Sequence, residues 1–480
     1  MRNLIFCAKN LIVLIFLVIS LGVSAQTYLT GTVSSKGSGI AGVVVTDGYS
    51  CVKTNSFGSY SILKSPEAKF IYISTPAGYL TDINSTIPQF YKNIDAATTI
   101  YNFELTKNAK SDLKHTVVVQ ADVQVTSVSD LNQYSTVVAD CKEYMKQYSG
   151  NDVFGLDCGD IVGDSPQLFS EYLKRVLPLN IPIYRAIGNH DMDYYGRSNE
   201  TSTHTFESYF GPTYYSFNKG NAHYIVVDNN FFIGREYFYM GYIDETTFHW
   251  LEQDLENVKD GSLLFFVMHI PSQLTAKQQP FEYNYGAIAD QTVNAGAIHD
   301  LLKKYDTHMI TGHMHYNINM CFSDRLMEHN TASVCGTWWQ LDVCLDGAPR
   351  GYAVYEVDGS NVQYHYKGQG HGRDYQMRVY DINASSEFPN DIIANVWNYD
   401  DKWKVEWFED GKLKGEMTKF IGFDPFAAAL CADPAKVKYS WIAPVKNEHM
   451  FRATPLNKNA KIEVRVTDRF GNIYKQEIKK

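Results

Sequence analysis

Five strand-like runs of apolar residues end in side chains that can bind a metal ion, and this arrangement constrains the fold more than any other feature. One run, at 181–187, stops at Gly188 and is followed by Asn189, His190 and Asp191. An apolar strand that ends in a glycine and a polar cluster is typical of a site at the carboxyl end of a sheet strand. The other four runs end at Asp122, Asp160, His269, and His313 with His315. The sequence therefore predicts one polar site that is built from several strand ends.

Strand and helix patterns alternate from residue 115 onward. The expected strands are 115–122, 152–160, 181–188, 223–229, 262–270 and 307–313, and the expected helices are 135–148, 167–177, 245–257 and 295–305. Alternation of this kind requires crossover connections and a sheet whose faces are covered by helices, so the expected fold class is α/β. Long connections in a compact domain usually form the walls of a site, and loops are expected at 194–215, 230–242 and 272–292.

Segments rich in β-branched residues flank this α/β region. Residues 26–108 contain short strand-like runs separated by Gly, Ser and Asn turns, which predicts an all-β sandwich module. Strand patterns return at 336–347 and 351–359, so the catalytic domain is expected to span residues 112–362. Residues 370–480 predict a second β-sandwich module, and the tryptophans expected in its core are Trp397, Trp403 and Trp407.

The N-terminus has the pattern of a cleaved secretion signal. Arg2 and Lys9 precede the apolar run 11–23, and small residues precede Gln26, so residues 1–25 are expected to be removed after Ala25. A membrane anchor is the weaker interpretation because the apolar run is shorter than about 18 residues. The protein is therefore expected to be secreted or periplasmic, with no transmembrane segment after signal removal.

The net charge and the cysteines further limit the class of protein that this chain can belong to. A net charge of -10 argues against binding to a nucleic-acid polymer or to an anionic membrane. One of the eight cysteines, Cys7, lies in the signal, and the seven that remain are scattered and odd in number. They do not form a disulfide framework, and the only pairing that their spacing leaves open is one bridge among Cys321, Cys335 and Cys344.

The polar residues at the strand ends have the chemistry of a site for two metal ions. Carboxylates, amides and imidazoles together suit divalent ions of the Mn, Fe or Zn class. His313 and His315 are two residues apart, and an extended backbone would place both on one face, so that they can serve two adjacent ions. Two cations about 3.5–4 Å apart would hold phosphoryl oxygens and turn a bridging water into hydroxide near neutral pH.

The order and spacing of these residues closely resemble those of the calcineurin-like metallophosphoesterase family. The matching blocks are DxQ at 122–124, GDxxxD at 159–164, GNHD at 188–191, MH at 268–269 and GHMH at 312–315. The resemblance covers about residues 115–358 and implies a central β-sandwich flanked by helices. The outer modules resemble the N- and C-terminal domains of a secreted bacterial branch of the family. The N-terminal module also resembles the regulatory domain of carboxypeptidases and other transthyretin-like sandwiches.

The resemblance implies a role for each residue. The first ion would be bound by Asp122, Gln124 and His315, both ions by Asp160, and the second ion by Asn189, His269 and His313. His190 would protonate the leaving oxygen as the general acid, with Asp191 as its partner, and such a proton transfer contributes about 10²–10⁴ in rate. Gln124 stands where the commoner pattern has a histidine. An amide oxygen is the weaker donor, so the affinity and the metal preference of the first site are left open.

Two further segments lie outside this set of ligands. Asp164 lies four residues after the bridging carboxylate, and it is expected to cap the helix that follows it. The segment around Trp338, Trp339 and Arg350 can be a turn between strands. It can also be a wall of the substrate pocket, in which Trp338 or Trp339 stacks on a leaving group and Arg350 meets the phosphate.

The sequence predicts a secreted, metal-dependent phosphoesterase that acts on a small-molecule or on a glycan- or lipid-linked phosphoester. One alternative is a pyrophosphatase for nucleotides or sugar nucleotides, which would use the same metal core. The other is a catalytically silent surface protein whose β modules bind glycan. The nearly complete ligand set and the presence of His190 favour an enzyme, and nothing in the sequence indicates the oligomeric state.

Overall fold

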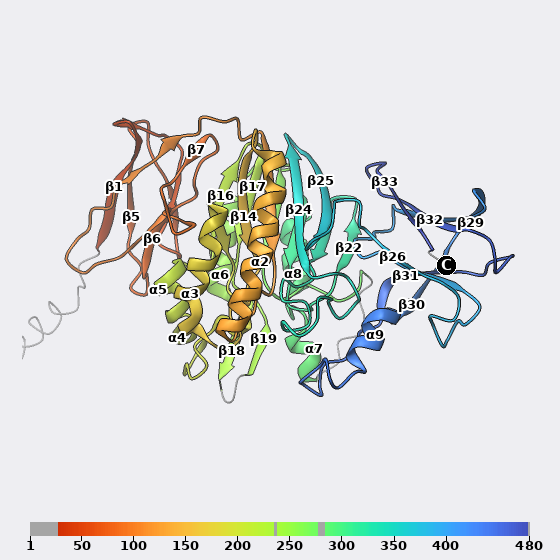
Figure 1. The fold of residues 1–480 in the computed structure, drawn as a ribbon. Coiled ribbons are helices and arrows are strands. Elements are labelled where there is room, and N and C mark those ends of the chain that lie inside the picture. The colour runs from red at the N-terminus through yellow and green to blue at the C-terminus, as the bar shows by residue number, and fades with distance from the viewer. Residues whose placement is uncertain (1–26, 235–237, 277–283, 479–480) are drawn as a thin grey trace, which may run out of the picture.

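A computed structural model describes residues 27–234, 238–276 and 284–478, so the expected signal at 1–25 lies outside the described residues. The chain forms an N-terminal β module, a central α/β domain and a C-terminal β module, which follow one another from left to right in Figure 1. Among the described residues, no helix is both long enough and apolar enough to cross a membrane.

The first sheet of the central domain contains three parallel strands and two antiparallel ones. Its order is β15-β14-β13-β24-β25, with β13, β14 and β15 parallel. The strands are β13 (Lys114–Gln120), β14 (Asp152–Asp157), β15 (Ile183–Arg185), β24 (Gly351–Asp358) and β25 (Asn361–Gly368). The sheet thus continues through β25, beyond the boundary expected at residue 362.

The second sheet has the order β16-β17-β20-β21-β23-β22. Its strands are β16 (Tyr215–Lys219), β17 (Ala222–Val226), β20 (Leu263–Val267), β21 (Asp306–Thr311), β22 (Ile318–Ser323) and β23 (Leu326–Asn330). The four strands β17, β20, β21 and β23 are parallel, and the two edge strands are antiparallel to their neighbours.

Aromatic rings join the two sheets. Tyr184 of the first sheet stacks on Phe217 of the second with ring centroids 3.6 Å apart. The stack continues to Tyr224 at 4.9 Å and from there to Phe265 at 4.7 Å. These rings are buried, and full burial of one such side chain stabilises the fold by about 1.5–3 kcal/mol. The stack fixes how the strand ends of one sheet lie against those of the other.

Helices cover the outer faces of both sheets. The first sheet packs against α2 (Val128–Met145) and α3 (Phe169–Val176), and the second against α6 (Glu245–Leu255) and α8 (Ala295–Leu302). Helix α2 begins before the expected start at residue 135 because the Ser127 hydroxyl accepts a hydrogen bond from the Asp130 amide and caps it. Short 3₁₀ turns occupy Lys146–Tyr148, Pro166–Leu168 and Leu177–Leu179. The predicted β-sandwich flanked by helices is confirmed.

The three segments expected as loops contain regular structure, so that prediction was wrong in detail. They hold α4 (Asn199–Ser202), α5 (His204–Phe210), the hairpin of β18 (Asn230–Gly234) and β19 (Phe238–Gly241), and α7 (Tyr285–Ala289). Helix α5 is stabilised by Phe206 and Phe210, which pack on Phe169 of α3. An element this short has too few residues to show a period in its sequence, so tertiary packing decides it.

The segment 336–347 was expected to form strands, and this prediction was also wrong. Gly336, Trp338 and Trp339 have φ values of 61°, 47° and 62°. A backbone in this left-handed region cannot continue a strand, and the segment forms consecutive turns.

The N-terminal module contains two main sheets and two short strand pairs. The sheets are β11-β1-β2 with β5 on β1, and β10-β6-β3-β4. The strands are β1 (Tyr28–Ser35), β2 (Ser38–Gly39), β3 (Val44–Thr46), β4 (Cys51–Lys53), β5 (Ser59–Leu63), β6 (Phe70–Ile73), β7 (Tyr79–Leu80), β8 (Ile83–Asn84), β9 (Ile87–Pro88), β10 (Tyr91–Asn93), β11 (Phe103–Glu104) and β12 (Thr106–Lys107). The buried core of this module is continuous with that of the central domain.

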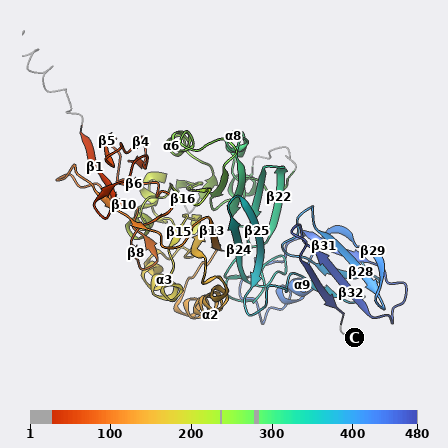
Figure 2. The same cartoon turned by 90° about the horizontal axis from the view of Figure 1, so that it is seen from above.

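The C-terminal module is built from two four-stranded sheets, β26-β27-β31-β30 and β29-β28-β32-β33. The strands are β26 (Arg378–Tyr380), β27 (Ile392–Asn395), β28 (Lys404–Glu409), β29 (Lys412–Glu416), β30 (Thr418–Gly422), β31 (Asn447–Ala453), β32 (Ile462–Thr467) and β33 (Ile473–Glu477), with helix α9 (Pro425–Cys431). Figure 2 shows this module at the end of the molecule opposite the N-terminal module. Trp403 and Trp407 lie in the core of this module, as expected. Trp397 is also buried, but it packs in a separate cluster with Ala332, Cys344, Ala348 and Tyr366.

The seven cysteines among the described residues are all free thiols. Cys335 and Cys344 are buried and Cys321 is partly buried, yet none of them is bonded to another. The bridge that the sequence left open among these three is therefore not formed.

Candidate metal centre

The predicted ligands lie at the carboxyl ends of strands from both sheets. Asp122, Asp160 and Asn189 follow β13, β14 and β15 of the first sheet. His269 follows β20, and His313 and His315 follow β21, in the second sheet. Parallel strands end at the same edge of a sheet, and the two edges face each other here, so all these side chains meet between the sheets.

One part of the cluster surrounds His269. Its Nε2 atom lies 3.0 Å from Asn189 Oδ1, 3.2 Å from His313 Nδ1 and 3.3 Å from Asp160 Oδ2. Asp160, His269 and His313 each place one ligand atom within 4.8 Å of the others, and among the described residues this is the group that could hold a metal ion.

The other part of the cluster contains Asp122, Gln124 and His315. Asp122 Oδ1 lies 3.4 Å from His315 Nε2, and both side chains are buried. Gln124 donates from Nε2 to Asp160 Oδ2 at 3.3 Å, while its buried Oε1 has no hydrogen-bond partner. A buried carbonyl oxygen without a partner costs about 1–3 kcal/mol, and a cation would satisfy it.

The protonation of His269 supports a cation between these groups. Its Nδ1 lies 2.7 Å from the carbonyl oxygen of Cys158, which can only accept, so Nδ1 carries the hydrogen. In the neutral ring, Nε2 then presents a lone pair to the oxygen of Asn189. Burial lowers the pKa of His269, but the carboxylate of Asp160 outweighs burial and raises it to about 9. The position therefore attracts positive charge, and the donor set fits a divalent metal ion.

Backbone strain is concentrated at the predicted ligands. Five of them have φ in the left-handed region, namely Asp122 at 52°, Gln124 at 44°, Asp160 at 53°, His313 at 71° and His315 at 57°. Residues with a side chain avoid this region, and each such residue costs on the order of 1–3 kcal/mol. Surrounding contacts must hold the strained conformation. The amide of His313, for example, donates to Asp122 Oδ2 at 2.9 Å.

His190 lies at the edge of the cluster. Its amide donates to Asp160 Oδ1 at 2.8 Å, and its ring Nδ1 lies 2.9 Å from Asp164 Oδ1. The other ring nitrogen, Nε2, is 4.0 Å from Asp160 Oδ2, and a quarter of the side chain (25%) is exposed. The ring is thus held by one carboxylate and reaches both the cluster and the solvent.

Three family profiles match successive parts of the chain. Residues 27–108 match the N-terminal domain of calcineurin-like phosphoesterases, residues 115–317 the calcineurin-like phosphoesterase domain, and residues 328–474 the C-terminal domain. The chain belongs to the calcineurin-like phosphoesterase family. It is a metal-dependent phosphoester hydrolase, and the silent glycan-binding alternative is therefore not retained.

Several solved structures are similar to this phosphoesterase. A dimetal phosphatase from Danio rerio has 13% identity and a TM-score of 0.37, over 53% of this chain and 96% of that chain. A purple acid phosphatase from yellow lupin (Lupinus luteus) seeds has 14% identity and a TM-score of 0.38, over 69% of this chain and 68% of that chain. No curated protein matches the sequence.

The structure places Asp164, and not Asp191, against the ring of His190. The Asp191 carboxylate accepts hydrogen bonds from the amides of Val162 and Gly188. Burial, followed by the charge of Asp160, raises its pKa to about 8. Asp191 therefore braces the loop that carries His190. The N-cap expected at Asp164 was wrong because the cap position is Ser165.

The predicted substrate wall is only partly at the site. Trp338 stacks on His315 with ring centroids 4.3 Å apart. Trp339 is buried and donates from Nε1 to the carbonyl of Val123, and Arg350 pairs with Gln369, Gln133 and Asp342. Trp339 and Arg350 therefore have structural partners, and their contact with a substrate stays a prediction.

Two aromatic residues that the sequence did not single out extend the aromatic surface of Trp338. Trp441 meets Trp338 edge to face at 4.5 Å, and Tyr439 stacks on Trp441 at 5.4 Å. Both come from the C-terminal module, and Trp441 is 58% and Tyr439 49% exposed. Their exposure was the one signal that could have found them, and it exists only in the folded chain.

Changing Asp160 to Asn is expected to lower the amount of metal bound per protein molecule. Asparagine can still accept from the His190 amide, but it lacks the charge that two cations would share. Metal content of the purified protein, measured by mass spectrometry, checks this. Asp300→Asn, on the exposed face of α8, is the matched control. Two ions and normal turnover in Asp160→Asn would contradict the bridging role.

Proposed function

We propose that this enzyme hydrolyses a small phosphate ester with two divalent ions of the Mn, Fe or Zn class. The convergence of acceptor atoms around His269 Nε2, at 3.0–3.3 Å, is the observation that carries the proposal. The ions, when bound, polarise the phosphoryl oxygens and lower the pKa of the attacking water. The residues proposed to hold them are Asp122, Gln124 and His315 for the first ion, Asn189, His269 and His313 for the second, and Asp160 for both.

His190 is the proposed proton donor. Asp164 accepts from Nδ1, which leaves Nε2 as the nitrogen that points toward a leaving group. Asp160 Oδ1 accepts a hydrogen bond from the His190 amide and so holds the backbone of His190. Asp164 therefore acts as a positioning residue, since it sets the angle of the ring and stabilises the imidazolium.

The proposed substrate has a leaving group with a flat apolar face, either an aromatic ring or one face of a sugar. The surface of Trp338, Trp441 and Tyr439 supports this because it lies directly beside His315. It is held there by the C-terminal module, where the amide of Val445 donates to the carbonyl of Leu345 at 3.0 Å. Monoesters, diesters and anhydrides with such a group would all meet this surface.

Replacing His190 with Asn is expected to affect alkyl esters far more than aryl esters. A phenolate leaves without much protonation, whereas an alkoxide needs a proton. The kcat for an alkyl phosphate should therefore fall by about 10²–10⁴, and that for an aryl phosphate much less. Asp164→Asn should give a smaller loss with the same dependence on the leaving group. Steady-state kinetics on the two esters checks both variants.

The control for this experiment is His204→Asn, because His204 is exposed on α5 and lies outside the cluster. Metal content should match the wild type in all three variants. Equal losses on both esters together with loss of metal would make His190 a ligand and overturn its role as the acid.

Replacing Trp441 with Ala is expected to raise the KM for nucleoside monophosphates and aryl phosphates by about 2- to 10-fold, the usual worth of one aromatic contact. The KM for a sugar phosphate in the same assay shows whether the surface binds an aromatic ring or one face of a sugar. The KM for glycerol phosphate, which has no flat face, should be unchanged. Leu456→Ala is the control, since Leu456 is a strongly exposed apolar residue of the same module. An equal change for every ester would refute the proposal.

Export is also part of the proposal. It is supported by the basic start, the apolar run and the small residues before Gln26. The mature protein should begin at Gln26 and be recovered outside the cytoplasm. The mass of the intact protein purified from its own cells checks this, and a mass that includes residues 1–25 would contradict it.

A further inference from the structure

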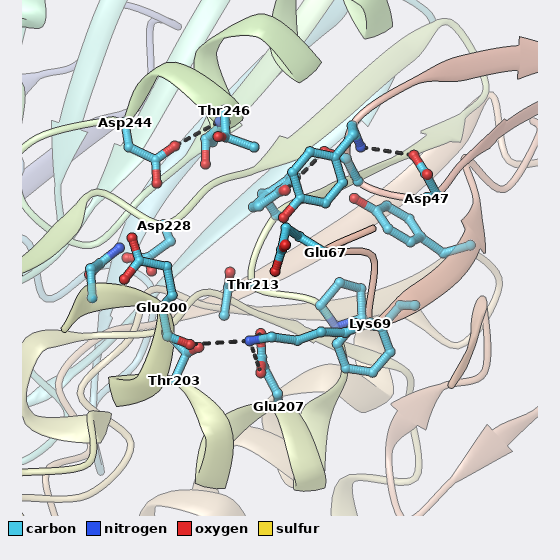
Figure 3. A pocket seen from close by; sticks show the side chains of 18 of the residues that line it. Asp47, Glu67, Lys69, Glu200, Thr203, Glu207, Thr213, Asp228, Asp244 and Thr246 are labelled. Carbon is cyan, nitrogen blue, oxygen red and sulfur yellow. Dashed lines mark hydrogen bonds and ion pairs between the residues drawn. The ribbon is translucent and has the colours of Figure 1, made fainter. Parts of the chain in front are cut away.

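A cavity of about 210 Å³ lies between the N-terminal module and the central domain, away from the metal ligands. Figure 3 shows its lining. The N-terminal module contributes the region around Asp47, Glu67 and Lys69, and the central domain contributes α4, α5 and the segments that lead into β16, β18 and α6. The cavity exists only because the two parts are packed together.

The lining carries a large excess of negative charge. Six carboxylates line the cavity, namely Asp47, Glu67, Glu200, Glu207, Asp228 and Asp244, and Lys69 is the one basic residue among the described lining residues. The formal charge is therefore -6 + 1 = -5. The ammonium of Lys69 contacts Glu207 Oε2 at 2.7 Å and the carbonyl oxygen of Glu200 at 3.3 Å. Within the part of the chain that the structure describes, the other five carboxylates form no ion pair.

Two buried polar atoms in the lining have no hydrogen-bond partner among the residues that the structure describes. They are the hydroxyl of Tyr72 and Oδ1 of Asn230, on side chains that are 2% and 1% exposed. Asn230 Nδ2 donates to the carbonyl of Ile187 at 2.8 Å and to Asp228 Oδ1 at 3.1 Å. Asn230 Oδ1 is therefore the atom that is left to accept. A buried acceptor without a donor costs about 1–3 kcal/mol, and its uncompensated oxygen adds to the negative potential of the cavity.

The raised pKa of Asp228 agrees with a cavity whose negative charge is not balanced by a cation. Burial raises its pKa to about 7, hydrogen bonds from Asn230 act in the opposite direction, and the charges of Asp244 and Glu207 raise it further. A positive charge beside Asp228 would oppose each of the effects that raise the pKa.

The spacing of the carboxylates decides between a metal ion and an organic cation. No three of them place ligand atoms within 4.8 Å of one another, because among the described residues only Asp160, His269 and His313 do so. A single ion could therefore not bind three of them at once. A cation with charges at separated points could, and the rings of Tyr49, Phe70, Tyr214 and Tyr242 offer apolar surface to the chain between those charges.

We propose that this cavity binds a small linear diamine or polyamine. The carboxylates receive its ammonium groups, as Glu207 already receives the ammonium of Lys69. Asn230 holds the carbonyl of Ile187, directly before the loop of Asn189 and His190. Asn230 and the Ile187 carbonyl would thus connect the bound amine to the loop of the metal centre.

Calorimetry on the full mature protein tests the proposal with three probes: 1,4-diaminobutane, butylamine and calcium chloride. Diaminobutane should bind saturably and raise the Tm of the protein, since a ligand that binds only the folded state stabilises it. Butylamine has the same chain with one ammonium, and its affinity should be lower by about 10-fold or more. Equal affinity for both amines, or preferential binding of calcium in this cavity, would overturn the proposal.

Two variants locate the binding. Glu67→Gln removes an exposed charge that forms no hydrogen bond or ion pair with any described residue, and Asp244→Asn keeps the acceptor that caps α6 at the Thr247 amide. Each should weaken diaminobutane binding by about 3- to 10-fold, as expected for loss of one charge-assisted contact. Glu448→Gln, exposed on β31 in the C-terminal module, should leave the affinity unchanged.

Neither lining variant lies in the catalytic machinery, so phosphoesterase activity and the circular dichroism spectrum should match the wild type and show that the variants fold. Wild-type affinity in both lining variants, or the same loss in Glu448→Gln, would mean that the amine binds the acidic surface in general and that this cavity is not an amine site.

Discussion

The close approach of the loops after β14 and β15 is the contact on which the metal centre depends. A Cβ at Gly188 would lie 2.1 Å from the amide nitrogen of Asp160 and 2.2 Å from its Oδ1, so only glycine allows these loops to meet. The amide of His190 can then donate to Asp160 Oδ1, which leaves Oδ2 facing Gln124 and His269. A single carboxylate in this way connects the loops of the first sheet with a histidine of the second.

The strain at the ligands needs a rigid support, and the aromatic stack between the sheets supplies it. Five predicted ligands have left-handed backbone conformations, each of which costs on the order of 1–3 kcal/mol. The burial of Tyr184, Phe217, Tyr224 and Phe265 stabilises the arrangement by a similar amount per ring. Side chains held in this way are already placed for a cation, so little reorganisation is needed when one binds.

The outer modules contribute side chains to surfaces of the central domain that are incomplete without them. Trp441 and Tyr439 extend the surface of Trp338 beside the metal cluster. At the other end, Asp47, Glu67 and Lys69 form one wall of the acidic cavity. The N-terminal module shows no ligand cluster in its sequence because its charged residues acquire a common environment only when the module packs on α4, α5 and α6.

The sequence by itself determined the residue types at the strand ends, because a run of apolar residues followed by Gly and a polar cluster is a local pattern. It also determined that strands and helices alternate, and the α/β class followed from this alternation. The sandwich and the role of each ligand followed from the resemblance to the phosphoesterase family. Only the tertiary structure decided that Asp164 meets His190, that Trp441 meets Trp338 and that 336–347 forms turns. These features depend on contacts between residues far apart in the chain and on left-handed backbone that local propensity disfavours, and packing alone determines both.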